Sequence, residues 1–171
     1  MKNQQKISEE QQKIINDLYS TDDQIVSKTI KDLRNKGGVF AIKPLMEVYF
    51  STSSAEISTA AFSIIRDLKA SQASVIISEN IIRYSANDKI SDFISALWQS
   101  AVKFDNLKVF VEIFVGGNDK TSLEIVTLIQ QNAYLLNDDS RKECLDVLKY
   151  EIGELNSFKK ALIVDLLEVF E

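Results

Sequence analysis

The residue types that most often perform chemistry in proteins are scarce in this chain. The sequence has no histidine and a single cysteine, Cys144. Without histidine the chain lacks the usual neutral-pH acid or base and the commonest metal ligand, and one thiol cannot build a thiolate zinc site. Cys144 stands at helical spacing with Leu148, which favours a buried core thiol over a nucleophile. We therefore expect no catalytic residue, no metal site and no cofactor.

The remaining reactive groups are carboxylates, and some of them are close enough along a helix to interact. The pairs are Asp88/Asp92, Glu143/Asp146 and Glu151/Glu154. No surrounding pattern indicates a dry pocket that would raise a carboxyl pKa, so we interpret them as solvated surface or as first-turn charges. Residues 116–119, Gly-Gly-Asn-Asp, lack the Gly-Lys-Ser/Thr of a phosphate loop and are expected to end one helix and start another.

Composition and charge limit the class of protein further. At 171 residues, with 45% hydrophobic and 26% charged residues, the chain is typical of one soluble domain with a sizeable core. The net charge is −5, with 11 Lys/Arg against 10 Asp/Glu in residues 1–86 and 9 against 15 in residues 87–171. This acidic balance opposes nucleic-acid binding, which normally requires a basic face.

Nothing in the sequence indicates export or membrane insertion. The polar start MKNQQKISEEQQ has no apolar core of the kind that a secretory signal requires, and one cysteine excludes an internal disulfide. No run approaches the roughly 20 apolar residues of a membrane span. We expect a cytoplasmic protein.

One proline, five glycines and nearly unbroken 3.6-residue apolar spacing predict an all-α fold. Residues 42–69 have the pattern of one complete helix–turn–helix unit, which cannot bury both apolar faces alone and needs similar neighbours. We predict one domain over residues 1–171. It contains about five two-helix repeats, at residues 7–37, 40–70, 72–103, 105–137 and 139–171. Residues 109–115 could instead form a strand entering a hairpin, although their spacing relative to the other pairs favours a helix.

The period of the repeat follows from the first strong apolar residue of each second helix. Successive spacings are 32, 33 and 33 residues for Ile25, Ile57, Ile90 and Leu123. Eight residues further on stand Leu33, Ile65 and Trp98, so Trp98 is expected in the core more than as a ligand platform. The fourth copy departs from the pattern at Gln131. Self-similarity at this period is typical of stacked two-helix repeats.

Pro44-Leu45 in a first helix, a polar turn, and then paired apolar residues over 57–65 resemble the HEAT-repeat family. The resemblance covers nearly the whole chain and implies a right-handed α-α superhelix, a short solenoid whose second helices line a concave surface that holds protein partners. The chain departs from the family pattern in two ways. Pro44 is its only such proline, and the position of the family's arginine is occupied by Val26, Ser58, Ser91 and Glu124.

The same alignment predicts a ladder of polar side chains across adjacent second helices. Its predicted members are Lys31, Arg34, Ser63, Arg66, Gln99 and Asn132. Arginine forks in such a ladder can hold backbone carbonyls or carboxylates of a bound peptide. The alternative is a solvated helix face with no partner.

Two classes of function are consistent with these patterns. The first is a non-enzymatic scaffold or adaptor that binds an unidentified protein or peptide on the concave face, with no nucleic acid or membrane partner, as a monomer or weak homo-oligomer. The second is an enzyme resembling the helical-repeat DNA glycosylases that remove alkylated bases from a basic, aromatic cleft. The acidic balance favours the first, whereas a continuous positive groove containing Trp98 and an exposed Asp would favour the second.

Overall fold

The computed structural model describes residues 7–36, 38–68 and 72–170, and these residues form helices and no strand. The all-α prediction is therefore confirmed, and residues 109–115 lie in a helix. The α-helices are α1 (Glu9–Leu18), α2 (Asp23–Lys36), α3 (Ile42–Ser51), α4 (Ala55–Arg66), α5 (Ala73–Asn80), α6 (Ile90–Gln99), α7 (Lys108–Gly116), α8 (Asp119–Asn132), α9 (Asp138–Glu151) and α10 (Ser157–Phe170). Short 3₁₀ helices are η1 (Val39–Ala41), η2 (Ile81–Tyr84) and η3 (Ala133–Leu135).

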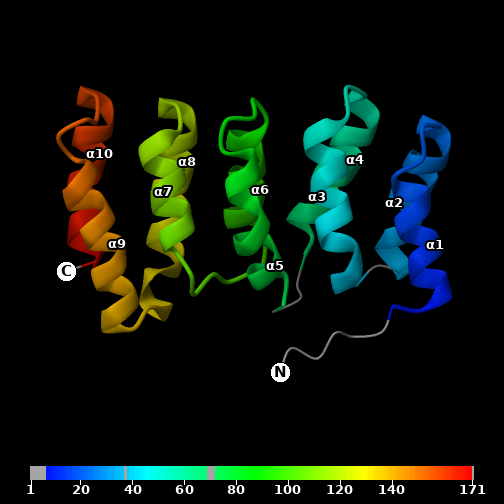
Figure 1. The fold of residues 1–171 in the computed structure, drawn as a ribbon, viewed down its shortest axis with the longest axis horizontal. Coiled ribbons are helices and arrows are strands. Elements are labelled where there is room, and N and C mark those ends of the chain that lie inside the picture. The colour runs from blue at the N-terminus through cyan, green and yellow to red at the C-terminus, as the bar shows by residue number, and fades with distance from the viewer. Residues whose placement is uncertain (1–6, 37, 69–71, 171) are drawn as a thin grey trace.

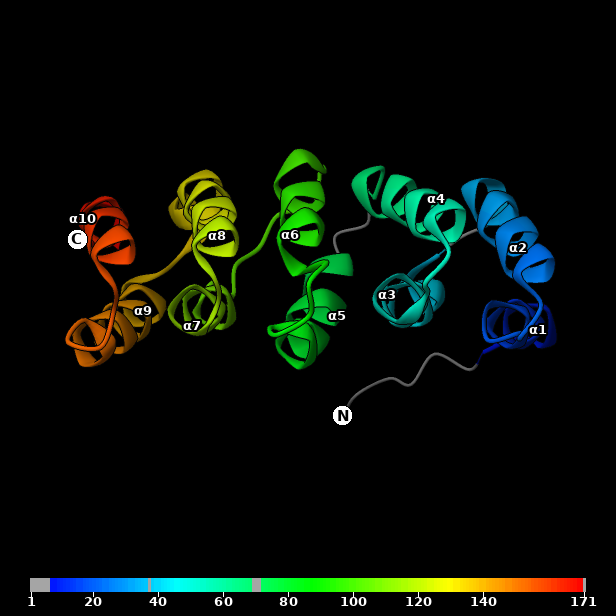
Figure 2. The same ribbon diagram turned by 90° about the horizontal axis from the view of Figure 1, so that it is seen from above.

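Consecutive helices form pairs that stand side by side in a row, from α1/α2 at one end to α9/α10 at the other (Figure 1). Seen from above, the odd-numbered helices occupy one layer and the even-numbered helices the other (Figure 2). We call the outer surface of α2, α4, α6, α8 and α10 the second-helix face. It carries the exposed side chains of Lys31, Arg34, Arg66, Gln99 and Lys120.

A polar side chain at or shortly before the start of each second helix accepts a backbone N–H two or three residues further on. We call these side chains the capping residues. They are Asp22 for α2, Ser54 for α4, Asn87 for α6, Asn118 for α8 and Asn156 for α10. In α2, α4, α8 and α10 the bonded amide lies in the first turn, where it has no partner within the helix. Asn87 lies in the turn before α6, which begins at Ile90.

Apolar side chains between the two layers form one core that runs through the row of pairs. Ala61 in α4 is fully buried. Aromatic rings fill the junction of the second and third pairs, where Phe50 stacks on Tyr84 with ring centroids 4.0 Å apart and lies 4.8 Å from Phe93. Burial of each such ring contributes roughly 2–3 kcal/mol, so this junction is held mainly by apolar packing.

Two lysines join neighbouring pairs by hydrogen bonds to helix ends. Lys89, just before α6, donates to two carbonyl oxygens at the C-terminal end of α3, at 2.9 and 2.5 Å. Lys159, in the first turn of α10, does the same at the end of α7, at 2.6 and 2.5 Å. Carbonyls at a helix end lack partners within the helix and lie at the negative end of its dipole, so each ammonium group stabilises them.

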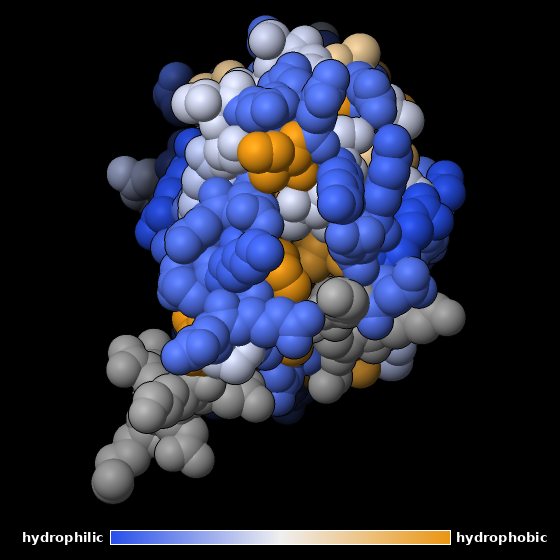
Figure 3. All heavy atoms as spheres, turned by 90° about the vertical axis from the view of Figure 1, so that its right-hand side faces the viewer, coloured by the Kyte–Doolittle hydropathy of each residue, from blue (hydrophilic) through white to orange (hydrophobic). Residues whose placement is uncertain are grey.

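The end of the row formed by α1 and α2 presents mainly hydrophilic side chains to solvent, with small apolar areas between them (Figure 3). A polar outer face is what a terminal helix pair needs when no further pair covers it. None of the helices in the described ranges is long and apolar enough to cross a membrane.

Candidate partner-binding face

Counting from the capping residues corrects the sequence alignment of the second helices. Leu123 lies five residues after Asn118, whereas the aligned residue of each earlier second helix lies three after its cap. The third residue of α8 is Thr121, which is fully buried, whereas Leu123 is 49% exposed. The fourth copy was therefore misaligned by two residues. Residues twelve after the caps, all of them exposed, are Arg34, Arg66, Gln99 and Gln130.

Three predicted ladder residues link α2 to α4. Arg34 Nη2 donates to Ser63 Oγ at 2.7 Å, and Lys31 Nζ lies 3.4 Å from Glu56 Oε1. Glu56 also accepts a hydrogen bond from Ser27 Oγ at 3.0 Å. The Ser27 hydroxyl and then the Lys31 ammonium stabilise the carboxylate and lower the pKa of Glu56. The structure thus brings Lys31, Arg34 and Ser63 together at one helix junction.

Two further ladder residues are exposed and contact only residues close to them in the chain, not a neighbouring helix. Arg66 Nε lies 3.9 Å from Asp67 Oδ1, and Gln99 Nε2 donates to Ser95 Oγ at 3.0 Å. Both side chains are at the surface, so neither contact removes them from solvent. Exposed pairs of this kind contribute little to stability and leave the groups available to a partner.

The prediction that Asn132 belongs to the ladder is wrong. Its side chain is 2% exposed, its Oδ1 accepts from the Phe104 backbone N–H at 3.0 Å, and its Nδ2 donates to the Leu128 carbonyl at 2.8 Å. These bonds fix the chain that leads into α7 against the end of α8. Asn132 is therefore a structural residue, and Gln130 occupies the surface position that was assigned to it.

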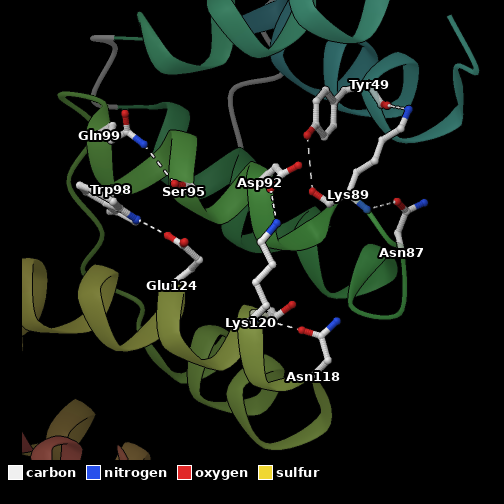
Figure 4. Close-up of polar contacts among 11 residues, drawn as sticks. Tyr49, Asn87, Lys89, Asp92, Ser95, Trp98, Gln99, Asn118, Lys120 and Glu124 are labelled. Carbon is white, nitrogen blue, oxygen red and sulfur yellow. Dashed lines mark hydrogen bonds and ion pairs between the residues drawn. The ribbon is translucent and has the colours of Figure 1, made fainter. Parts of the chain in front are cut away.

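The face continues across α6 and α8 through two cross-helix contacts (Figure 4). Lys120 Nζ lies 2.7 Å from Asp92 Oδ1, and this hydrogen bond and charge raise the pKa of Lys120. The indole Nε1 of Trp98 donates to Glu124 Oε2 at 2.7 Å. Trp98 is half-buried against the core, so its ring packs inward while its N–H joins the surface network.

Two of these contacts share an offset that sequence reasoning missed. A residue two after a cap meets the residue five after the preceding cap, in Glu56 with Ser27 and in Lys120 with Asp92. The remaining contacts, such as Ser63 with Arg34 and Glu124 with Trp98, join other positions. The capping residues were the signal that could have revealed the shared offset.

A hollow opens on the face between α4 and α6. It is lined by Tyr49, Ser58, Thr59, Phe62, Asp92 and Ser95. The Tyr49 side chain is 3% exposed, and burial raises its pKa to about 12, so the phenol is neutral at pH 7. Hydroxyl groups and a carboxylate around an aromatic floor can exchange hydrogen bonds with a peptide backbone.

Two observations concern metal ligands and the cysteine thiol. Within the described ranges, no group of three or more His, Cys, Asp or Glu side chains is placed to hold a metal ion. Cys144 is buried, and this burial raises the pKa of its thiol to about 11, so the thiolate is disfavoured at neutral pH. The groups described on the second-helix face include hydroxyls, amides and paired charges, which can form hydrogen bonds.

Comparisons of this chain with protein-family models, with curated proteins and with solved structures found no match.

Proposed function

We propose that this protein is a short α-solenoid of HEAT-like repeats and a non-enzymatic scaffold that binds a protein or peptide on its second-helix face. The observation that carries the proposal is the set of side-chain contacts between neighbouring second helices. Glu56 with Ser27 and Lys120 with Asp92 join the same positions at the α2–α4 and α6–α8 junctions, which supports one continuous surface across the second helices. Such surfaces in repeat proteins are extended binding sites.

The polar groups of this face suit a polypeptide partner. Arg34 and Arg66 occupy equivalent positions on neighbouring helices and remain exposed. An arginine fork matches the geometry of carboxylates and backbone carbonyls. The hydroxyl-lined hollow between α4 and α6 adds further donors and acceptors within reach of the same ligand.

The alternative of a glycosylase-like enzyme gains no support from the face. Cations on it lie next to anions, as in the Lys31–Glu56 and Lys120–Asp92 pairs, and do not form a continuous positive groove. The indole N–H of Trp98 is held by Glu124. A strongly anionic ligand would meet neutralised or negative groups on much of this surface.

A capture experiment with charge-reversal variants tests the proposal. Arg34→Glu with Arg66→Glu changes the second-helix face, and Lys108→Glu with Lys142→Glu makes the same charge change on exposed residues of the other layer. Loss of two charge-assisted contacts of about 1 kcal/mol each should lower partner retention from a host lysate at least tenfold. Equal retention by the two double variants, measured by quantitative mass spectrometry, would refute the second-helix face as the binding surface.

A further inference from the structure

The hollow between α4 and α6 holds one carboxylate among hydroxyl groups and aromatic rings. Asp92 is the only charged side chain among the described residues that line it, and the others are Tyr49, Ser58, Thr59, Phe62 and Ser95. The volume of the hollow is about 280 Å³, which lies just below the range of sites for whole drug-sized ligands. The hollow is therefore of a size for a single side chain, and its charge favours a cationic one.

The carboxylate of Asp92 is only partly satisfied within the protein. Its Oδ1 accepts from Lys120 Nζ at 2.7 Å, whereas no hydrogen bond joins Oδ2 to another described residue. The side chains of Lys120 and Asp92 are 66% and 60% exposed, so water screens this pair and a ligand can compete with it. Asp92 lies between Lys120 and the ring of Tyr49 (Figure 4). Burial and then the negative charge of Asp92 raise the pKa of Tyr49, which agrees with a carboxylate close to the phenol.

The other cation near the hollow, Lys89, is held at the end of α3. Its Nζ donates to the carbonyls of Tyr49 and Thr52 at 2.9 and 2.5 Å and lies 5.6 Å from the centroid of the Tyr49 ring. Lys89 forms no ion pair with Asp92. The Oδ2 atom of Asp92 is thus open to a cation from a ligand.

The lining suits an arginine guanidinium better than a lysine ammonium. A guanidinium group carries five N–H donors in one plane, so it can bond a carboxylate and neighbouring hydroxyl groups at the same time. Ser58 and Thr59 supply such hydroxyls, and neither bonds through its hydroxyl to another described residue. The ring of Phe62, which is half-buried on the wall, offers a face on which the planar group can stack.

We propose that the hollow between α4 and α6 is a pocket for one arginine side chain of the partner, in which Asp92 holds the guanidinium group and Phe62 stacks on it. We call it the arginine pocket. This inference rests on the proposed function, because it assigns the chemistry by which the second-helix face recognises its partner.

A titration followed by NMR of the full chain, labelled with ¹⁵N, tests the arginine pocket. The probes are Nα-acetyl-arginine amide and its lysine and citrulline counterparts, because citrulline keeps the shape of arginine without its charge. Asp92→Asn removes the carboxylate charge. Asp146→Asn is the matched control, since Asp146 is an exposed carboxylate on the odd-numbered layer.

We expect the arginine probe to shift the amide signals of Ser58, Thr59 and Ser95 saturably. Asp92→Asn should bind it at least tenfold more weakly, because a charge-assisted contact is lost, and Asp146→Asn should match the wild type. The lysine probe should bind at least about threefold more weakly than arginine, and citrulline should not bind. Lys120→Met should bind arginine at least as tightly as the wild type, because the competing ammonium is gone.

Four results would overturn the arginine pocket. They are the absence of saturable shifts at about 50 mM arginine probe, equal binding of arginine and either counterpart, unchanged binding in Asp92→Asn, and weaker binding in Lys120→Met. Partner capture from a host lysate is a further readout, because Asp92→Asn should retain less partner than Asp146→Asn. Equal retention by these two variants would show that the partner places no arginine in the hollow.

The same measurements separate this inference from the proposed function. If arginine fails to bind the hollow while Arg34→Glu with Arg66→Glu still lowers partner capture, the arginine pocket alone is wrong. If arginine binds through Asp92 while neither Asp92→Asn nor the Arg34/Arg66 variant lowers capture, the hollow binds a guanidinium group, but the second-helix face does not bind the partner and both proposals fail.

Discussion

Replacement of Lys159 by methionine should lower the stability of the folded protein, because Lys159 joins α10 to the end of α7. The Lys159 ammonium donates to the carbonyls of Val115 at 2.6 Å and Gly117 at 2.5 Å, and its side chain is 6% exposed. Methionine has a similar length and no charge, so Lys159→Met removes both bonds and leaves the end of α7 without its partner. The control is Lys160→Met, because Lys160 is exposed and makes a single bond at 3.2 Å.

The stability change expected for Lys159→Met follows from two opposing contributions to the free energy of unfolding. Each charge-assisted hydrogen bond to a carbonyl contributes about 1.5–3 kcal/mol. The burial that lowers the pKa of Lys159 shows that holding the ammonium out of water costs free energy, and methionine avoids this cost. We expect a net loss of about 2 kcal/mol of unfolding free energy, which corresponds to a fall in Tm of roughly 4–8 °C for a chain of this length.

Urea unfolding and thermal melts followed by circular dichroism at pH 7 measure this loss. Lys160→Met should differ from the wild type by less than about 0.5 kcal/mol. Lys89→Met tests the equivalent contact at the end of α3, and the double variant with Lys159→Met should show the sum of the two single losses, because the sites share no partners. If Lys159→Met were as stable as Lys160→Met, the lysine contacts would not hold the pairs together.

Three further substitutions test the packing and the electrostatics. Ala61→Arg should destabilise by at least about 4 kcal/mol and abolish cooperative folding, because Ala61 is fully buried and a charge would enter the seam between helices. Thr121→Val should leave stability unchanged or raise it by about 1 kcal/mol, since the buried Thr121 Oγ1 has no hydrogen-bond partner. Tyr49→Phe should reduce the loss of stability at alkaline pH. Burial raises the Tyr49 pKa from 10.0 to about 12, so wild-type stability is full below pH 10 and falls by about 2.5 kcal/mol as pH approaches 12.

Thermal melts check the first two substitutions, and urea unfolding at pH 9 and pH 12 checks the third. A cooperative melt of Ala61→Arg near the wild-type midpoint would contradict the close seam at α4. A loss of more than about 1 kcal/mol in Thr121→Val would mean that the hydroxyl group has a partner in solution. An alkaline loss in Tyr49→Phe equal to that of the wild type would show that the Tyr49 phenol does not hold its proton in the folded state.

The helices could be predicted from the sequence because they carry an apolar period, and because several of them, such as α1, α4 and α8, also begin at a polar cap. Residues 109–115 were the hardest case, since β-branched and aromatic residues before a Gly-Gly turn are also typical of a hairpin. The structure places them in α7, whose end is held by Lys159. Local propensity did not distinguish a helix from a strand for residues 109–115, and packing against neighbouring helices favours the helix.

The candidate site was predicted less completely, because the second helices were aligned on their first strongly apolar residue and that residue is not always buried. In α8 the buried positions hold Thr121 and Ser122, both fully buried, so the first strong apolar residue is the exposed Leu123. Alignment on that residue shifted the fourth copy and placed Asn132 in the ladder instead of Gln130. In α2 the adjacent Ile25 and Val26 are both apolar, and contacts with other helices decided that Val26 is buried and Ile25 is 41% exposed.

The cross-helix contacts of the three lysines were also not predicted, although the position of each lysine in the sequence indicated a nearby partner. Lys89, Lys120 and Lys159 follow an asparagine cap by two or three residues, where the positive end of the helix dipole disfavours a cation. Such a placement indicates an anion or a set of carbonyls nearby. Which one is present depends on the neighbouring pair: Lys120 meets Asp92, whereas the other two lysines meet helix ends.

Photo-crosslinking in host cells tests the central claim that the second-helix face binds a protein. A photoreactive amino acid replaces Gln99 or Gln130 on that face, and Glu112 or Lys142 on the odd-numbered layer, all of which are exposed. We predict covalent adducts with the same partner from the positions at Gln99 and Gln130, and none from the other two. Adducts from Glu112 and Lys142 alone would contradict the account.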